Sequence, residues 1–192
     1  YYRGLNSMLI IQLPTGSGKT RIANTFIRDE LLAKNKRVLW VAPGYELLFQ
    51  ACRELTEISF TNIFNSVGRC GDIPPLKKVP ENLSAKVVYV TLNTMARGTR
   101  AKKIAAEKFD YIVIDEVHHG IAGQGQTNLM KWFSNATFIG LSATPKIGNK
   151  GKYISQYVYS DLIGERPRIL ADCEYVHEKT GVTIATVDWP SN

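Results

Sequence analysis

Residues 9–20 read LIIQLPTGSGKT. An apolar run typical of a buried strand ends at Pro14, two glycines follow, and the stretch finishes at Lys19 and Thr20, where a helix is expected. Glycines in such a turn let backbone N–H groups approach a phosphate that a Cβ would keep away. The start of the helix adds positive partial charge. The stretch therefore predicts a phosphate-binding loop between a strand and a helix.

The loop supplies the candidate nucleotide-binding residues. They are Thr15, Gly16, Ser17, Gly18, Lys19 and Thr20. A lysine at this position can reach the β- and γ-phosphates, and the Thr20 hydroxyl can ligate Mg²⁺. The general pattern is GxxxxGK[ST], and this chain has Leu13 in place of the first glycine.

The composition limits the remaining possibilities. The 192 residues suffice for one sizeable core, and 24 basic against 17 acidic residues give a net charge of +7, which favours a polyanionic partner without establishing one. Cys52, Cys70 and Cys173 form no CxxC pair and are expected to be buried thiols. No apolar run approaches the roughly 20 residues of a membrane span, and no signal peptide is evident. We expect a cytoplasmic protein without a membrane partner.

Five apolar runs predict strands. They are Met8–Gln12, Arg37–Ala42, Lys86–Thr91, Tyr111–Asp115 and Thr137–Leu141. Helices are expected over Lys19–Lys34 and Tyr45–Ile58. The apolar runs are continuous, as in strands covered on both faces, and helices separate them, which predicts a parallel α/β sheet. Gly68–Ser84, with three prolines, is expected to be an irregular loop, and Tyr153–Asn192 has no clear period.

The stretch YIVIDEVHH, residues 111–119, places two acids directly after a predicted buried strand. Ligands of open α/β sheets bind at the edge where the strands end. Asp115 is the candidate Mg²⁺ ligand through the water shell of the ion, and Glu116 is the candidate base for the attacking water. The alternative is a pair of ordinary surface carboxylates. The pair His118-His119 is not favoured as a metal site, because adjacent residues rarely reach one ion and no HExxH pattern is present.

Five segments in order carry a resemblance to a known family. LPTGSGKT, DEVHH and LSATP resemble motifs I, II and III of superfamily 2 helicases and translocases, whose loop usually reads xxTGSGKT, as it does here with Leu13. VLWVAPGYELLFQA (residues 38–51) resembles motif Ia, and VTLNTM (residues 90–95) resembles motif Ib. The resemblance covers about Leu5–Pro145. DEVHH and GLSATP are most similar to the motor branch of type I and type III restriction enzymes.

The resemblance implies a RecA-like three-layer α/β/α sandwich with a mainly parallel sheet. Residues 1–150 would form the first, ATP-binding lobe, and residues 151–192 a C-terminal extension leading towards a second lobe. ATP and Mg²⁺ would be the cofactors, with Lys19, Asp115 and Glu116 catalytic and with Thr20 and Asp115 holding the metal. The second lobe would supply an arginine finger, and the 47 residues after Pro145 are too few to form it. GRCGD at residues 68–72 imitates part of the arginine pattern, but it lacks the second arginine and precedes motif II.

Motifs Ia and Ib contact the nucleic-acid backbone in this family. The resemblance therefore implies contacts from Pro43, Gly44, Tyr45, Thr91, Asn93 and Thr94. Gly44 stands where Arg, Lys or Thr is commoner. Arg97 and Arg100, in the basic stretch after motif Ib, are either further phosphate contacts or part of a solvated face. His118, Ser142 and Thr144 would relay the nucleotide state to the nucleic-acid site, although a serine and a threonine there can also simply cap a turn.

The function implied is an ATP-dependent DNA helicase or translocase. Its partners would be DNA, a second RecA-like lobe and, as candidates, nuclease or specificity subunits. The alternatives are an RNA helicase lobe, a lobe completed by another subunit, and a nucleotide-dependent interaction module without turnover, against which the intact Glu116 argues. A small GTPase is not favoured, because NKGK at residues 149–152 has lysine where the base-reading aspartate belongs.

Overall fold

The computed structural model of the chain describes residues 8–59, 66–96, 98–119, 124–143 and 151–156. Within these residues seven strands form one sheet in the order β3-β4-β2-β5-β6-β1-β7. The strands are β1 (Met8–Gln12), β2 (Val38–Ala42), β3 (Val67–Arg69), β4 (Val87–Thr91), β5 (Tyr111–Ile114), β6 (Thr137–Ser142) and β7 (Gly151–Gln156). Every pairing in this sheet is parallel, which confirms the predicted α/β fold.

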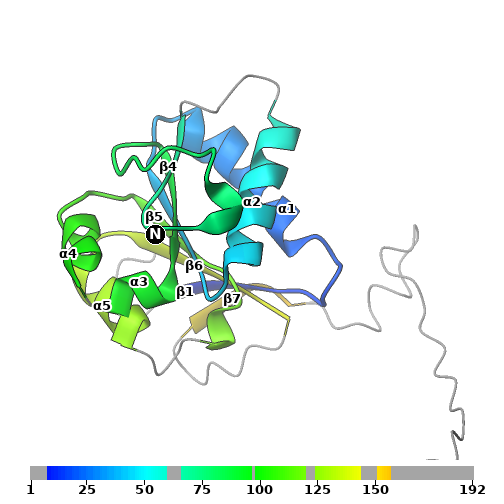
Figure 1. Cartoon of the computed structure of the whole chain (residues 1–192). Helices are drawn as coiled ribbons and strands as arrows, with labels where there is room; N and C mark the ends of the chain where they lie inside the picture. The colour runs from blue at the N-terminus through cyan, green and yellow to red at the C-terminus, as the bar shows by residue number, and fades with distance from the viewer. Residues whose placement is uncertain (1–7, 60–65, 97, 120–123, 144–150, 157–192) are drawn as a thin grey trace, which may run out of the picture.

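Helices cover both faces of the sheet. They are α1 (Lys19–Phe26), α2 (Tyr45–Ile58), α3 (Leu92–Ala96), α4 (Thr99–Ala105) and α5 (Gln124–Trp132), with the π-helix η1 (Ile27–Leu32) and the short 3₁₀ helices η3 (Pro74–Leu76) and η4 (Val117–His119). Figure 1 shows α1 and α2 on one side of the sheet and α3, α4 and α5 on the other. This is the three-layer sandwich that the family resemblance predicted.

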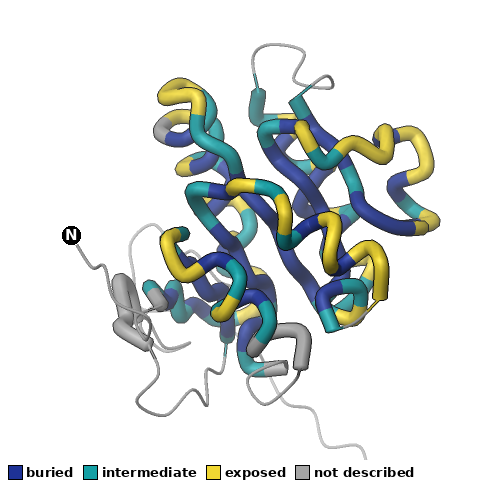
Figure 2. Tube along the Cα trace, turned by 90° about the vertical axis from the view of Figure 1, so that its left-hand side faces the viewer, coloured by how far each residue is buried: buried dark blue, intermediate teal, exposed yellow. Residues whose placement is uncertain are grey.

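Each face of the sheet has its own apolar core. In β2, Val38, Trp40 and Ala42 belong to the core under α1 and α2. Leu39 and Val41 belong to the core under α3, α4 and α5, because successive side chains of a strand point to opposite faces. All five are fully buried, and Figure 2 shows buried residues running through the centre of the molecule. Burial on both faces is the reason that the strand sequences are continuously apolar.

The predicted helix over Lys19–Lys34 is a composite. It starts as α1 and continues as the six-residue π-helix η1, a form that is rare and mostly confined to single turns. Lys36 N donates to Leu31 O at 2.8 Å, and Asn35 has a φ of 58°. This left-handed conformation at Asn35 turns the chain out of the helix towards β2.

Two strands were not predicted, and the loop predicted over Gly68–Ser84 is wrong at its start. β3 has three residues, with Gly68 at its centre. A Cβ at Gly68 would lie 2.1 Å from Asn82 O and 2.9 Å from Ala85 Cβ, so the turn before β4 can cross β3 only at a glycine. A short strand with a central glycine lacks the apolar run by which a strand is recognised. The other strand, β7, falls in the predicted C-terminal extension and pairs with β1.

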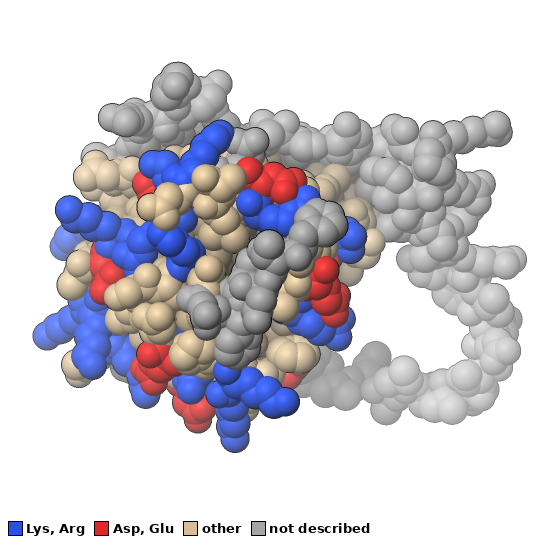
Figure 3. Space-filling model, turned by 90° about the horizontal axis from the view of Figure 1, so that it is seen from above, with Lys and Arg blue, Asp and Glu red and all other residues tan. Residues whose placement is uncertain are grey.

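The edge at which the strands begin is covered by ion pairs. Arg37 Nη1 lies 2.9 Å from Glu107 Oε2, and its guanidinium carbon lies 4.7 Å from the centre of the Phe109 ring. Lys36 Nζ lies 3.0 Å from Asp110 Oδ1. Figure 3 shows basic and acidic side chains interspersed on the face seen from above. The excess positive charge is therefore not gathered into one patch on that face.

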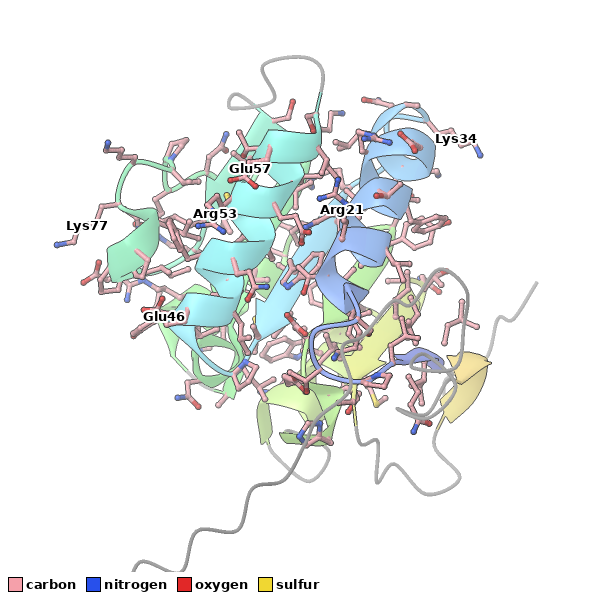
Figure 4. All side chains as sticks on the ribbon, turned by 90° about the vertical axis from the view of Figure 1, so that its right-hand side faces the viewer. Arg21, Lys34, Glu46, Arg53, Glu57 and Lys77 are labelled. Atoms are coloured by element: carbon pink, nitrogen blue, oxygen red, sulfur yellow. The ribbon has the colours of Figure 1, made fainter. Side chains whose placement is uncertain are left out.

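The outer faces of α1 and α2 are charged. Figure 4 shows the two helices side by side, with Arg21, Arg53 and Glu57 projecting from them. Arg53 Nε lies 3.3 Å from Glu57 Oε1, an exposed pair of a kind that stabilises a protein by at most about 1 kcal/mol. Across the described part of the chain, no helix is both long enough and apolar enough to cross a membrane.

Two of the three cysteines are buried free thiols, as predicted. Burial raises the pKa of the Cys52 thiol to about 11 and also raises the pKa of Cys70. Because the thiolate is the reactive form, both groups are inert near neutral pH. Cys173 lies outside the described residues.

Candidate active site and nucleic-acid edge

The segments that carry the sequence motifs meet along one edge of the sheet. In a parallel sheet all strands end at the same edge, which is where ligands bind in open α/β folds. Because β1, β6 and β5 are neighbours, the segments that follow them lie together. β2 and β4 are also neighbours, and their following segments form the adjoining part of the edge. We call the first part the nucleotide end and the second part the nucleic-acid end.

The loop between β1 and α1 has the backbone of an anion cradle. Gly16 and Gly18 have φ values of 82° and 86°, a left-handed conformation that side chains oppose. Ser17 closes the turn, since its N and Oγ lie 3.3 and 2.6 Å from Pro14 O. Gly18 caps α1, whose first backbone N–H groups have no partner within the helix and are free for an anion or a solvent molecule. The loop therefore presents donors and a positive helix end at one place.

Lys19 is held inside this loop. Its Nζ donates to Pro14 O at 3.1 Å, and the residue is 8% exposed. Burial lowers the pKa of the Lys19 ammonium, while the negative charges of Glu116 and Asp115 oppose that shift. The loop after β1 and the acids after β5 lie at the same edge of the sheet, because both strands pair with β6. The predicted phosphate-binding lysine and the predicted acids are thus brought together by the fold.

Asp115 follows β5 and is almost completely buried, with 4% of its surface exposed. Its backbone N donates to Val41 O at 2.8 Å, and its Oδ1 accepts a hydrogen bond from Glu116 N at 3.0 Å. Burial first, and the charge of Glu116 second, raise the pKa of Asp115 to about 6. A divalent cation would add to the opposing charge that Lys19 already supplies to this buried carboxylate.

Glu116 has an unusual backbone and an unpaired oxygen. Its φ is 46°, which is rare outside glycine, asparagine and aspartate and costs of the order of 1–3 kcal/mol. Among the described residues, no donor forms a hydrogen bond to its buried Oε2. His118 Nδ1 lies 3.3 Å from this oxygen, an ion pair only if the ring is protonated. A strained backbone and an acceptor without a donor thus coincide at Glu116, one of the two predicted acids.

His118 and Ser142 form the contact between η4 and β6. His118 Nδ1 lies 2.7 Å from Ser142 Oγ, and Ser142 is fully buried. The carbonyl of Ser142 accepts a hydrogen bond from Leu13 N at 3.2 Å, at the entrance of the phosphate loop. The structure therefore brings together two of the three predicted coupling residues and adds a link to the loop that the sequence did not indicate. Thr144 lies outside the described residues.

The nucleic-acid end begins at the segment after β2. Gly44 precedes α2 in an extended conformation with a φ of −130°, and no side chain caps the helix. A Cβ at Gly44 would meet nothing within 4 Å, so the surface there is open. Tyr45 is 46% exposed, and Pro43 is partly buried. Pro43, Gly44 and Tyr45 thus offer partly exposed backbone and an exposed aromatic ring, and none of the three carries a charge.

The polar residues at the end of β4 and in the segment that follows have two different roles, since one caps a helix and two face outward. Thr91 is 7% exposed, and its Oγ1 lies 2.9 Å from Thr94 Oγ1 and 3.3 Å from Thr94 N. Thr91 thus caps the N-terminus of α3, and its hydroxyl is buried and does not face outward. Asn93 is exposed and Thr94 is half-buried, so these two residues form the outward polar surface of the turn.

Arg100 belongs to the same end, together with a segment that the sequence did not assign to it. The left-handed Gly71, after β3, lies beside both Thr94 and Arg100, since a Cβ there would be 3.7 Å from atoms of each. Arg100 Nε lies 3.9 Å from Glu81 Oε1, and the arginine side chain is 57% exposed. The glycines of the stretch at residues 68–72 are the signal in the sequence that points to this segment. Arg97 lies outside the described residues.

Comparisons with known proteins agree with this geometry. The family described as "Type III restriction enzyme, res subunit" matches residues 4–147. The endonuclease subunit of the type I restriction enzyme EcoAI from Escherichia coli is 33% identical over 147 residues, covering 74% of this chain and 17% of the subunit. The ATP-dependent DNA helicase mph1 of Sclerotinia sclerotiorum is 24% identical over 185 residues, covering 93% of this chain and 15% of the helicase. The chain thus spans less than one fifth of either relative.

Solved structures show the same fold. The helicase domain of Hef from Pyrococcus furiosus superposes with a TM-score of 0.60 at 24% identity, covering 86% of this chain and 37% of that one. The type ISP restriction-modification enzyme LlaGI, solved with a DNA substrate mimic, superposes with a TM-score of 0.61 at 17% identity, covering 82% of this chain and 18% of that one.

Proposed function

The chain belongs to the family of type III restriction enzyme res subunits, and from this premise we propose that it is the ATP-binding lobe of an ATP-dependent motor that moves along or unwinds DNA. One observation carries the proposal. A buried lysine at the start of α1 and two acids after β5 are close enough for each acid to affect the pKa of the lysine. Opposite charges buried at the ligand-binding edge of a parallel sheet fit a nucleotide with its metal ion better than they fit a structural ion pair.

The nucleotide would be ATP. Its phosphates would accept hydrogen bonds from the backbone N–H groups of residues 15–20 and from the Lys19 ammonium, in place of the carbonyl of Pro14. The Thr20 hydroxyl and Asp115 would hold Mg²⁺, which neutralises charge that develops on the phosphates during transfer. Within the described residues, no three metal-ligating side chains gather in one place. This fits Mg²⁺, which keeps several waters and is usually bound by one or two carboxylates with substrate phosphates.

Glu116 would orient the attacking water and accept its proton. The buried Oε2, which accepts no hydrogen bond from the described residues, is available as that acceptor. His118 Nδ1 contacts both Ser142 Oγ and this oxygen of Glu116. A movement of Glu116 on nucleotide binding or hydrolysis would therefore be transmitted through His118 to Ser142 on β6. Thr144 would help to relay the nucleotide state together with Ser142.

The nucleic acid would be DNA, bound through its phosphates at the nucleic-acid end. Exposed backbone near Pro43, Gly44 and Tyr45, and the polar groups of Asn93 and Thr94, suit contacts that position a strand without reading bases. Arg97 and Arg100 would add positive charge. Thr91 would not contact DNA directly but would cap the N-terminus of α3. Two relatives are DNA enzymes by name, a DNA helicase and a restriction endonuclease subunit, while a third is named a putative ATP-dependent RNA helicase.

Partner domains are part of the proposal. A second RecA-like lobe would complete the nucleotide site, with the first lobe over residues 1–150 and the segment 151–192 leading towards it. Nuclease or specificity subunits would be attached, as in restriction enzymes, and the location would be cytoplasmic. An arginine supplied across the nucleotide can be worth about 10³–10⁵ in rate, so the isolated lobe should hydrolyse ATP very slowly.

The test is nucleotide binding by the chain itself. Calorimetry with ADP and Mg²⁺ should detect weak binding, and Lys19→Ala should abolish it. Lys77→Ala is the matched control and should bind like the unsubstituted chain, because it removes an exposed lysine, directly after η3, that Figure 4 shows projecting outward. Unchanged ADP affinity in Lys19→Ala would refute the assignment of the loop.

A further inference from the structure

The side-chain amide of Asn128, on α5, lies at the end of a different helix. Its Nδ2 atom is 2.9 Å from Met95 O and 3.0 Å from Ala96 O. These are the last two carbonyls of α3, and the last carbonyls of a helix have no partner within it. An amide group carries two donor hydrogens, and here both are directed at one helix end. Asn128, a residue of another helix, therefore caps the C-terminus of α3 with its side chain.

Helix α3 depends on such contacts for its position. It has five residues, and isolated helices shorter than about 12–15 residues are marginal in water. Thr91 caps its start through Thr94, and Asn128 closes its end. Between them the side chain of Met95 is fully buried. These contacts set the position and direction of α3, and with them the orientation of the exposed Asn93.

Helix α5 is connected to the nucleotide end in two ways, by its position in the sequence and by its packing in the core. It is the first α-helix after the acid pair Asp115-Glu116. Leu129, next to Asn128, is fully buried in the same core as Met95 and Val117, and Val117 directly follows Glu116. One packed body therefore connects the end of α3 to the segment that carries the acids.

We infer that Asn128 is a positioning residue for the nucleic-acid end, which holds the final carbonyls of α3 so that Asn93, Thr94 and the surrounding backbone meet a phosphate in one fixed geometry. The inference rests on the proposed function, because it requires nucleic acid at this end. A side chain that merely filled the space would leave two carbonyls without donors, whereas a planar amide with two hydrogen bonds specifies both the place and the direction of the helix end.

The decisive variant is Asn128→Asp, which keeps the shape but replaces both donor hydrogens with a charge that repels the carbonyls. Asn135→Asp is the matched control, because it adds the same negative charge at an exposed position in the turn after α5. Binding of labelled single-stranded and duplex DNA by the whole chain is measured by anisotropy, ADP–Mg²⁺ binding by calorimetry, and folding by circular dichroism.

We expect DNA affinity to fall about tenfold in Asn128→Asp, because a displaced end of α3 no longer holds Asn93 and Thr94 in the geometry that meets a phosphate. In Asn135→Asp the affinity should change less than about twofold. ADP affinity should be the same in both. Lowering the pH until the introduced carboxyl is protonated restores one donor, so the gap in DNA affinity between the two variants should narrow.

Three results would overturn the inference. Equal DNA affinities of the two folded variants would leave the proposed function standing and remove the role of Asn128. A parallel loss of ADP affinity in Asn128→Asp would mean that the amide is only a structural cap. Absence of DNA binding by the unsubstituted chain would remove both the inference and the proposed nucleic-acid end. If Asn128→Asp does not fold, the DNA affinities of Asn128→Ala and Asn135→Ala are compared in its place. The loss of DNA affinity expected in Asn128→Ala is smaller, because alanine adds no charge that repels the carbonyls.

Discussion

The nucleotide end and the nucleic-acid end occupy one continuous edge of the sheet, yet they are built in opposite ways. At the nucleotide end the functional side chains are ionisable and buried, with Lys19 8% and Asp115 4% exposed. At the nucleic-acid end they are mostly neutral and outward, with Asn93 exposed and Tyr45 46% exposed. The first end relies on side-chain charge, and the second on backbone and shape.

This difference explains how strictly each end constrains its residues. A buried charge is costly unless other groups compensate it, so each residue at the nucleotide end depends on the identity of the others. An exposed backbone segment keeps its hydration and places few demands on the side chains that it carries. Gly44, where the family more often has a side chain that can contact phosphate, illustrates this tolerance. Substitutions should therefore have large effects at the first end and graded effects at the second.

The largest expected effect is that of Glu116→Gln. In the enzyme assembled with its second lobe, ATP turnover should fall by about 10²–10⁴, because the amide cannot accept the proton of the attacking water. ADP affinity should be retained. Asn93→Ala, at the other end, should leave turnover at saturating DNA within a few-fold. Steady-state ATPase assays check both, and an active Glu116→Gln enzyme would end the assignment of the base.

The next effect concerns stability and pH. The pKa of Asp115 is raised from 3.8 to about 6, so the folded state holds this proton more tightly than the unfolded state does. Stability from the protonated carboxyl is therefore full below pH 4 and is lost as the pH rises through about 6. Asp115→Asn should remove this loss and raise the free energy of unfolding at pH 7.5 by the order of 2 kcal/mol, while weakening ADP–Mg²⁺ binding.

Urea unfolding of the metal-free chain at pH 4 and pH 7.5 measures this effect. The difference between Asp115→Asn and the unsubstituted chain should grow with pH. A difference that is the same at both pH values would show that the carboxyl is not destabilised by its surroundings. Asn93→Asp should show little dependence of this kind, since an exposed carboxyl keeps its ordinary pKa.

A smaller effect is expected from Thr91→Val, which keeps the shape and removes both hydroxyl contacts with Thr94. Loss of a helix cap costs about 1 kcal/mol in the free energy of unfolding. The control Thr99→Val, at an exposed position, should change it by less than about 0.5 kcal/mol. Equal values for the two variants in urea unfolding would mean that α3 does not depend on its cap.

The smallest effect should be that of Arg100→Ala. If this arginine contacts a phosphate, its removal should reduce the slope of log affinity against log salt by about one unit. Lys77→Ala removes the same charge at an exposed position that was not predicted to contact nucleic acid, and it should leave the slope unchanged. Fluorescence anisotropy across a salt series measures these slopes. Identical slopes for both variants would assign Arg100 to the solvated surface, where Glu81 pairs with it.

Much of the fold was predictable because its strands are buried on both faces. Continuous apolar runs predicted β1, β2, β4, β5 and β6, and glycines predicted the turn before α1. β3 was missed because its centre must be glycine for the chain to cross at Asn82, which removes the usual strand signal. The π-helical end of the first helix was also missed, since an amphipathic pattern does not distinguish the hydrogen-bond register of one helix from another.

The residues of the nucleotide end could be predicted from local sequence patterns. Lys19, Asp115 and Glu116 are recognisable because each follows a strand and because a phosphate loop allows few residue types. Only the tertiary structure decided which groups face one another. The strand order places Ser142 between the acids and the loop, turns Thr91 inward, and brings Asn128 to the end of α3. Such contacts depend on strand order, register and helix packing, which join residues far apart in the chain, so no local pattern of residues can encode them.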